Sequence, residues 1–333
     1  MTGRPRAGTT WMAGLALLAL VAAGCGGNAS GRAAPASTRL TLYTCVTDAT
    51  QKAVVAGFTR SHPGVTVQVF RAPTGQLNAR VAGDVRSGGL RADVVWACDP
   101  LTMQGYVRQH LVGGWTPAGA AALPAAYRTA DAVGAALLYV VAVHRHGTPA
   151  PEAWGDLTGP AFRKAVALPD PAFAASALGA VGWFVQTPSL GPGFLRALHA
   201  NGAVTVKTPD DVTTGVAQGI YRAGVTISSS ANAAKKAGSP LDVVWPRPGA
   251  IAVWGPVAVS RTSAHPATAR AFVEYLVSEP GQRALAATGA YPTRPGVSGP
   301  PLPAGAGVVS PDWTALAGRT AALLAAYRAA LGG

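Results

Sequence analysis

Residues 92–101 read ADVVWACDPL, and this stretch decides the fold class of the chain. Its first part, residues 93–97, is an apolar run with the length of a buried strand. Asp99 followed by Pro100 has the pattern of an N-cap and a first-turn proline, so the next helix is expected to begin here. A strand that turns directly into a helix is typical of βαβ units, in which the strands run parallel.

The same alternation precedes this stretch. Residues 40–44 and 65–70 have the period-2 pattern of strands, and each leads into a segment with one apolar helical face, over 49–61 and 76–85. The order is therefore βαβαβα. This order predicts an α/β protein with doubly wound, mainly parallel sheets.

The residues downstream continue the mixed pattern. Strands are predicted over residues 133–143, 165–168, 204–206, 224–228, 241–245 and 251–259. Helices are predicted over residues 173–184, 210–218 and 229–236, after His265-Pro266, and over the Ala-rich tail 313–331, with a further helical stretch before residue 166.

The beginning of the chain has the features of a bacterial export signal. Arg4 and Arg6 precede an apolar stretch, residues 11–23, that suits a signal-peptide core and is too short to span a bilayer. Small residues then lead to Cys25, as in lipoprotein signals, although Ala22 stands where that motif usually has Leu.

We therefore expect a signal peptide over residues 1–24, lipidation of Cys25 and a flexible tether over residues 25–38. No later stretch is long and apolar enough for a transmembrane helix. The expected location is the outer face of the bacterial cell membrane, reached by export and held by the lipid. Export with cleavage near this point and no lipidation is the alternative.

The composition argues against nucleic-acid binding. The formal net charge is +13, but the basic residues are scattered and the longest basic run is Lys235-Lys236. An RNP-like stripe of aromatic and basic residues and zinc-ligand spacings are both absent from the sequence. Hydrophobic residues make up 49% and charged residues 12% of the chain, which supports a packed core.

Catalytic motifs are also absent from the sequence. It contains no G-x-S-x-G, no P-loop and no G-x-G-x-x-G after a strand. His144 and His146 share one strand face, but no acidic residue is near them in sequence, so a zinc site is not indicated. We expect no enzyme activity, no cofactor and no bound metal. A secreted α/β hydrolase or transferase and a scaffold lipoprotein without a ligand are the alternatives.

Several motifs together resemble family 1 extracellular solute-binding proteins, which are type 2 periplasmic binding proteins similar to the ferric-iron and phosphonate binders. The resemblance covers almost everything after residue 39. It is carried by the opening strand 40–44, by residues 92–100, by Asp242-Val243-Val244-Trp245-Pro246 with Pro248-Gly249, by residues 265–272 with Ser278-Glu279-Pro280-Gly281-Gln282, and by Tyr291-Pro292-Thr293-Arg294.

This resemblance implies two α/β lobes joined by crossover strands, with a ligand in the cleft between them. Lobe one is expected over residues 39–137 and 257–333, and lobe two over residues 138–256. Hinge closure would bend residues 140–143 and 253–256. The implied function is that of a monomeric substrate-binding lipoprotein that delivers a small molecule to an ABC permease.

The position of the ligand follows from a rule for open parallel α/β sheets, in which ligands bind outside the carboxyl ends of the strands. Hydroxyl groups and free backbone N–H groups at helix N-termini there are good anion receptors, and Trp254 is a candidate stacking surface. The expected ligand-binding residues are Thr44, Thr47, Thr74, Gly75, Gln76, Asp99, Ser176, Ser228, Ser229, Ser230 and Trp254.

The side chains at the expected cleft indicate the class of ligand. Ferric binders of this family usually present two adjacent Tyr residues, and this chain has Ser228-Ser229-Ser230 at the matching stretch and no Tyr-Tyr pair anywhere. Hard cations prefer anionic oxygen ligands, of which this cleft has few. We expect a small anion or zwitterion such as a phosphonate, with ferric iron as the alternative.

Two cysteines follow the first and third strands. In a 2-1-3 strand order these strands are neighbours about 4.8 Å apart, which is within the Cα range of a disulfide. Cys45 and Cys98 come just after these strands, so we expect a disulfide between them at the rim of the cleft. Two free thiols are the alternative.

Overall fold

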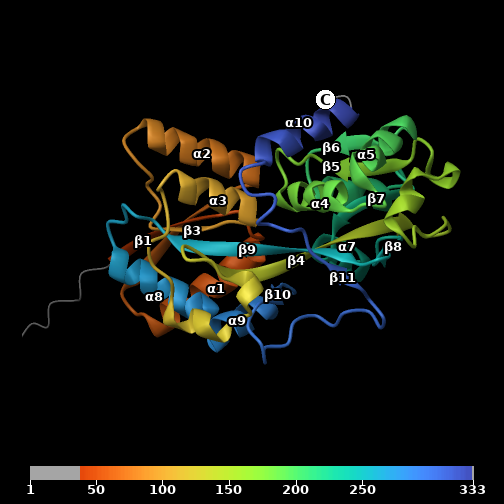
Figure 1. Ribbon diagram of the computed structural model, residues 1–333. Helices are drawn as coiled ribbons and strands as arrows, with labels where there is room; N and C mark the ends of the chain where they lie inside the picture. The colour runs from red at the N-terminus through yellow and green to blue at the C-terminus, as the bar shows by residue number, and fades with distance from the viewer. Residues whose placement is uncertain (1–37, 332–333) are drawn as a thin grey trace, which may run out of the picture. The chain divides into compact units, whose positions relative to one another are not determined.

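The structure, a computed structural model, describes residues 38–331 (Figure 1). The predicted signal peptide, the lipidation site at Cys25 and the predicted tether up to residue 37 lie outside the described residues. None of the helices between residues 38 and 331 is long and apolar enough to cross a membrane.

Three βα units begin the described chain as predicted. The strands are β1 (Thr38–Thr44), β2 (Val65–Arg71) and β3 (Val94–Trp96), and the helices are α1 (Asp48–Ser61), α2 (Thr74–Arg86) and α3 (Pro100–Arg108). The strands are parallel and lie in the order β2-β1-β3. Thr47 and Asp99 cap α1 and α3 by accepting the backbone N–H groups of Thr50 and Thr102, which confirms the expected start of α3.

Two long strands then cross the molecule. They are β4 (Val133–Arg145) and β9 (Ala250–Val259), and they pair antiparallel from Val133 opposite Val257 to Val140 opposite Ile251. At one end β9 pairs with β3, and at the other end β4 pairs with β7 (Ala223–Ile227) and β8 (Leu241–Val244). The two predicted sheets are therefore hydrogen-bonded into one sheet of eleven strands. Eight of them lie in the order β2-β1-β3-β9-β4-β7-β5-β6, which ends with β5 (Val166–Pro169) and β6 (Val204–Val206), and the other three pair with β4 or β9 beside this row.

We call the part of the sheet with β1–β3 its first half and the part with β5–β8 its second half. The second half consists of another set of βα units. Its elements are β5 (Val166–Pro169), α4 (Ala175–Gln186), α5 (Gly191–Ala200), β6 (Val204–Val206), α6 (Pro209–Ala217), β7 (Ala223–Ile227), α7 (Ser228–Lys236) and β8 (Leu241–Val244). Helix α5 was not predicted. The helical stretch expected before residue 166 is instead two short 3-10 turns, Trp154–Thr158 and Pro160–Phe162, because Pro160 and two glycines interrupt it.

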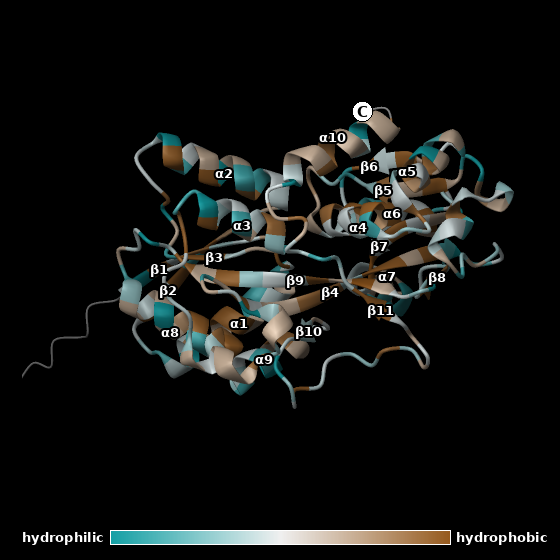
Figure 2. Ribbon diagram, viewed as in Figure 1, coloured by the Kyte–Doolittle hydropathy of each residue, from teal (hydrophilic) through white to brown (hydrophobic). Residues whose placement is uncertain are grey.

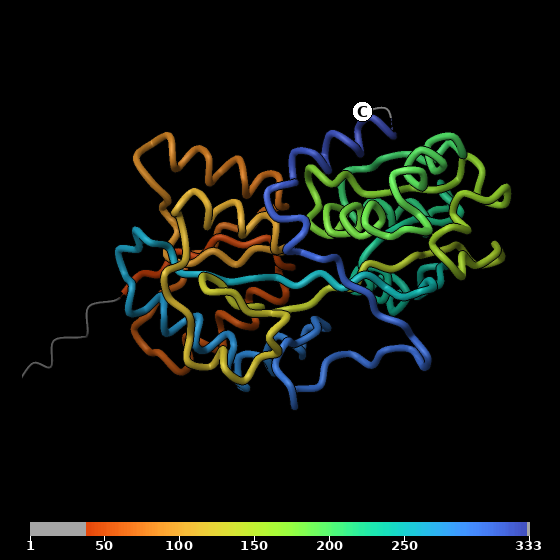
Figure 3. The backbone as a smooth tube through the Cα atoms, viewed as in Figure 1, coloured from red at the N-terminus to blue at the C-terminus, as the bar shows by residue number. Residues whose placement is uncertain are grey.

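The chain closes with α8 (Pro266–Val277), α9 (Glu279–Ala286), β10 (Tyr291–Pro292), β11 (Val308–Val309) and α10 (Thr320–Leu331). The predicted tail helix over residues 313–331 is wrong in its first part. Gly318 has a φ of +76°, which a right-handed helix does not accept, so α10 begins only after it. Figure 3 traces the stretch from β10 to β11 along the lower edge of the view.

Helices cover both faces of the sheet, and its apolar residues form separate cores. In the first half, α1, α8 and α9 pack on one face and α2 and α3 on the other. In the second half, α4 and α5 share a core with Leu323 and Tyr327 of α10. The C-terminal helix therefore packs against elements of the predicted lobe two, which corrects the expectation that residues 257–333 all return to lobe one. Apolar residues are prominent along β4 and β9 (Figure 2).

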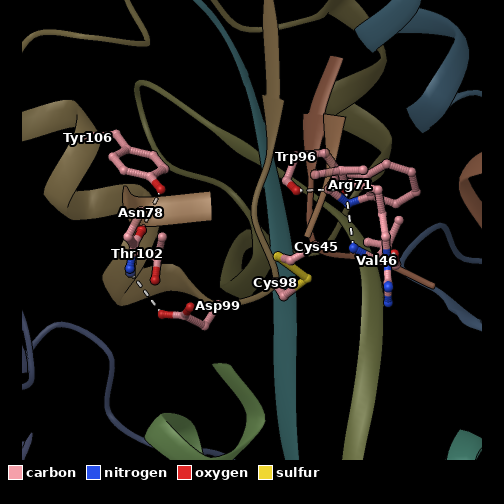
Figure 4. Close-up of a disulfide and its surroundings, with 10 residues drawn as sticks. Cys45, Val46, Arg71, Asn78, Trp96, Cys98, Asp99, Thr102 and Tyr106 are labelled. Atoms are coloured by element: carbon pink, nitrogen blue, oxygen red, sulfur yellow. Dashed lines mark hydrogen bonds between the residues drawn. A yellow bond between two sulfur atoms is a disulfide. The ribbon is translucent and has the colours of Figure 1, made fainter. Parts of the chain in front are cut away.

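The expected disulfide is present. Cys45 and Cys98 are joined, with their Cα atoms 5.9 Å apart, at the ends of the neighbouring strands β1 and β3 (Figure 4). The bridge closes a loop with a sequence separation of 53 and so restricts the unfolded chain.

We predict that the double variant Cys45→Ala/Cys98→Ala loses about 4 kcal/mol of unfolding free energy, the chain-entropy value for a loop of this length. Denaturant unfolding of the wild type and of the variant without reductant measures this loss. Reductant should bring the wild type to the stability of the variant. Equal stability of the two proteins without reductant would show that the bridge does not form in solution.

Candidate functional site

A cavity of about 370 Å³ opens where the loop after β1 faces the first turn of α7. Residues 136–138 of β4 and Gly255 of β9 line it from the two crossing strands. Residues 288–290 of the loop after α9 and Tyr291 of β10 line it from the first half of the sheet, and residues 227–230 line it from the second. The cavity is therefore lined by both halves of the sheet and by the two strands that cross between them.

Four of the predicted ligand-binding residues line this cavity: Thr47, Ser228, Ser229 and Ser230. Thr47 is the N-cap of α1, and Ser228 follows β7 directly, so both are held by the ends of neighbouring secondary structure. The disulfide between Cys45 and Cys98 is also part of the wall. The rule that ligands bind beyond the carboxyl ends of parallel strands, called here the strand-end rule, thus selected residues at the first turns of α1 and α7 that line the cavity.

Thr44 supports the site without lining it. Its buried hydroxyl donates to the carbonyl of Trp96 at 3.0 Å and accepts the N–H of Val46 at 3.2 Å. These bonds fix the direction in which the chain leaves β1. The predicted role of Thr44 as a ligand contact is therefore replaced by a role in shaping the loop.

The residues predicted after β2 lie elsewhere. Thr74, Gly75 and Gln76 form the first turn of α2, and the structure does not bring them to the cavity. The N–H of Gly75 instead points to the carbonyl of Phe173, 3.4 Å away in the other half. This is a direct backbone contact between the two halves of the sheet.

Asp99 is buried at the start of α3 (Figure 4). One carboxylate oxygen accepts the N–H of Thr102 at 2.8 Å, and the other has no hydrogen-bond partner in the described structure. Burial raises the pKa of Asp99 to about 6, against the opposing effect of the hydrogen bonds from Thr102. Asp99 therefore serves as a helix cap and does not line the cavity.

Two further predicted ligand-binding residues, Ser176 and Trp254, do not line this cavity. Ser176 is buried in the first turn of α4, outside the cavity lining. Trp254 faces a different cavity of about 290 Å³ beside α3, where its ring lies against Tyr127 with the centroids 6.3 Å apart. Strand alternation explains this position, because Trp254 and its neighbour Gly255 point to opposite faces of β9.

The cavity also contains residues that sequence reasoning missed. Asp210, in the first turn of α6, lines the wall, and its carboxylate accepts the hydroxyl of Ser230. Tyr291 of β10 lines the opposite wall, where burial raises the pKa of its phenol and a hydrogen bond with Ser228 opposes that rise. Tyr291 belongs to a motif used only for the family resemblance, and Asp210 follows the helix-start signal Thr208-Pro209.

Hydroxyl groups connect the wall on the side of the first half. The Oγ1 atoms of Thr47 and Thr50 are 2.8 Å apart, and those of Thr50 and Thr288 are 2.9 Å apart. This chain of hydroxyls ties the start of α1 to the end of α9. It holds the loop after β1 in a defined position relative to Tyr291.

The wall of the cavity carries both positive partial charge and negative charge. The first residues of α1 and α7 line it, and helix N-termini carry a partial positive charge that favours anions. Asp210 supplies a carboxylate, which favours a hydroxyl or ammonium group. The described lining includes no Lys or Arg, and no group of three or more His, Cys, Asp or Glu among residues 38–331 is placed to hold a metal ion.

The raised pKa of Asp99 gives a pH prediction. The folded-state pKa, about 6, lies above the ordinary value of 3.8, so the folded state favours the neutral acid. The resulting destabilisation is fully present above pH 6 and disappears as the pH falls to 4. Asp99→Asn keeps a capping side chain but removes the buried charge.

We predict that Asp99→Asn raises the unfolding free energy at pH 7 by about 3 kcal/mol at most and makes it less dependent on pH between 4 and 6. Urea unfolding of both proteins across this range measures the effect. A variant that is less stable than the wild type at pH 7, with the same pH profile, would contradict the assignment.

Comparison with known proteins agrees with this geometry. Residues 40–290 match the family model described as a bacterial extracellular solute-binding protein. An uncharacterized protein from Haemophilus influenzae is 30% identical over 134 residues, which are 40% of this chain and 39% of that protein. The match to this curated relative thus spans less than half of its length.

Solved structures resemble almost the whole described fold. AfuA from Actinobacillus pleuropneumoniae, with exogenous fructose-6-phosphate bound, has 16% identity and a TM-score of 0.80, covering 89% of this chain and 99% of its own. Iron-bound HitA from Pseudomonas aeruginosa has 19% identity and a TM-score of 0.76, covering 88% and 99%. The substrate binding protein of an ABC transporter from Agrobacterium tumefaciens has 17% identity and a TM-score of 0.78, covering 91% and 96%.

These likenesses confirm the predicted fold, which is that of the two-lobed periplasmic binding proteins. The family match extends over most of the described chain and includes every residue that lines the cavity except Tyr291. The chain belongs to the bacterial extracellular solute-binding proteins.

Proposed function

We propose that this protein is the substrate-binding lipoprotein of an ABC importer and that it captures a small phosphonate or phosphate ester in the cavity between α1 and α7. The observation that carries the proposal is the combination of two helix N-termini with one carboxylate in a cavity walled by both halves. Two similar proteins support it: one is described with fructose-6-phosphate bound, and another as an ABC transporter substrate binding protein.

Each wall has a part in binding. The anionic end of the solute lies at Ser228, Ser229 and Ser230, where hydroxyl and backbone N–H donors meet at the start of α7. Asp210 accepts a hydrogen bond from a hydroxyl or ammonium group of the same solute. A ligand with an anionic end and a donor fits this arrangement better than a bare anion, because a bare anion leaves Asp210 unneutralised.

Ferric iron is the second candidate, since iron-bound HitA has a similar fold. In the cavity, Asp210 and Tyr291 would be its anionic oxygen ligands. Burial raises the pKa of Tyr291, which disfavours the phenolate that ferric iron would bind. Two ligands, one of them held in its neutral form, support a hard trivalent cation less well than the serines support an anion.

Closure of the lobes is the proposed capture step. The backbone contact between Gly75 and Phe173 already joins the halves in this structure, so it belongs to the proposed closed state, and Gly75 has no side chain to obstruct it. A Cβ atom at this position would lie 2.6 Å from the carbonyl oxygen of Ala172, which is a backbone atom and cannot turn away. The bending would fall in residues 140–143 and 253–256 of the crossing strands.

Gly75→Ala should therefore weaken solute binding about tenfold, corresponding to about 1.4 kcal/mol, by disfavouring the closed state. Calorimetry measures the affinity, and small-angle scattering with and without solute measures closure. Gly83→Ala in the same helix is the matched control, because the nearest atom to its Cβ is a flexible arginine 4.0 Å away. Equal affinities of the two variants would exclude this contact from the closed state.

The ligand class is tested by a thermal-shift screen of the purified protein against aminoalkylphosphonates, sugar phosphates, inorganic phosphate and ferric citrate. A phosphonate or phosphate ester at 100 times its Kd should add about 2.7 kcal/mol of stability and raise the midpoint by several degrees. Asp210→Asn should weaken binding of these solutes about tenfold, and it should strengthen rather than weaken binding of inorganic phosphate, because the unneutralised carboxylate is gone.

The control for Asp210→Asn is Glu152→Gln, which removes one negative charge from an exposed pair with Arg247. This variant should bind like the wild type. A shift with ferric citrate and with none of the phosphorus compounds would overturn the proposed ligand class in favour of iron.

A further inference from the structure

A second hollow adjoins the cavity between α1 and α7. It is a groove of about 720 Å³, and it shares Ser229, Ala233, Thr288 and Gly289 with the cavity. The groove runs between α7 and α9, and residues 296–300 of the stretch after β10 form its outer side. A solute in the cavity therefore has room to continue into the groove.

Three polar side chains of the groove lack partners within residues 38–331. Asn232, Lys236 and Ser298 line it, and their side chains make no hydrogen bond or ion pair with other described residues. The neighbouring Lys235 is different, because its Nζ lies 2.7 Å from a carboxylate oxygen of Asp242. Lys236 is thus a cation without a counter-charge at the edge of a hollow connected to the proposed binding site.

The groove has a positive balance of charge. Arg283 of α9 lines it on the side opposite Lys236, and part of its guanidinium is engaged by Glu279 on its own helix. The described lining of the groove includes no Asp or Glu. An anion here would interact with Lys236 of one half and Arg283 of the other.

We propose that this groove is a second subsite that binds the far end of an elongated solute, and that this end carries a second anionic group such as a phosphonate, phosphate or carboxylate. The inference rests on the proposed function, because it extends the same ligand. Ser228–Ser230 would hold one anionic end at the N-terminus of α7, and Lys236 would hold the other at its C-terminus.

The helix sets the length of such a solute. Helix α7 has nine residues, Ser228–Lys236, which rise about 12 Å from first to last. Side chains of a helix lean toward its N-terminus, so the ammonium group of Lys236 reaches back along α7. The two anionic groups of the solute are therefore expected about 8–12 Å apart.

The test uses two series of probes of increasing chain length, the α,ω-alkanediphosphonates and the ω-hydroxyalkylphosphonates. Both offer a phosphonate to α7, but only the first carries a second anion. Calorimetry on the wild type should show at least tenfold tighter binding of the diphosphonate than of the hydroxyalkylphosphonate at the best length. That preference should vanish for diphosphonates too short to place two anions 8 Å apart.

Lys236→Gln should abolish the preference and leave binding of the hydroxyalkylphosphonates unchanged. Lys235→Gln is the matched control on the same helix and should keep the preference, because Lys235 is held by Asp242. Equal binding of both series by the wild type, or a preference that survives in Lys236→Gln, would overturn the second subsite while the proposed function stands. Binding of neither series would overturn the proposed function itself, and the subsite with it.

Discussion

The site depends on the hydrogen bonding between β4 and β9, which joins two halves that would otherwise be separate sheets. All ten residues of β9 are buried, and its register with β4 is continuous from Val253 to Gly255 at the level of the cavity. Because these strands belong to both halves, they connect the first turn of α1 with the first turn of α7. Any bend within them would change the distance between these two turns, so the crossing strands control the width of the cavity.

Much of this arrangement follows from local patterns in the sequence. The units from β1 to α3 were predictable because strand alternation, helix periodicity and the Asp99-Pro100 helix start all indicate the same elements. The disulfide was predictable for a related reason, since neighbouring parallel strands place the residues that follow them close together. The predicted tail helix was too long because its alanines indicate helix while Gly318 adopts a positive φ that interrupts it.

The side chains of the site were only partly predictable, because the strand-end rule locates loops and does not determine the direction of each side chain. It identified Thr47 and Ser228–Ser230, which do line the cavity. It also selected Asp99, whose carboxylate turns back to cap α3, and Trp254, which points to the other face of β9. Asp210 and Tyr291 were missed because tertiary packing brings them to the cavity from α6 and β10, outside the selected loops.

The charge of the site shows why net charge was a poor guide to function. The chain carries +13, yet the described lining of the cavity has no Lys or Arg, so the positive partial charge at its wall comes from backbone dipoles at helix ends. Such dipoles are fixed in direction and lose no side-chain entropy on binding, whereas a lysine does. Serines at a helix start would thus select a ligand by the directions in which it can accept hydrogen bonds. An unpaired lysine one helix length away would add affinity only for solutes long enough to reach it.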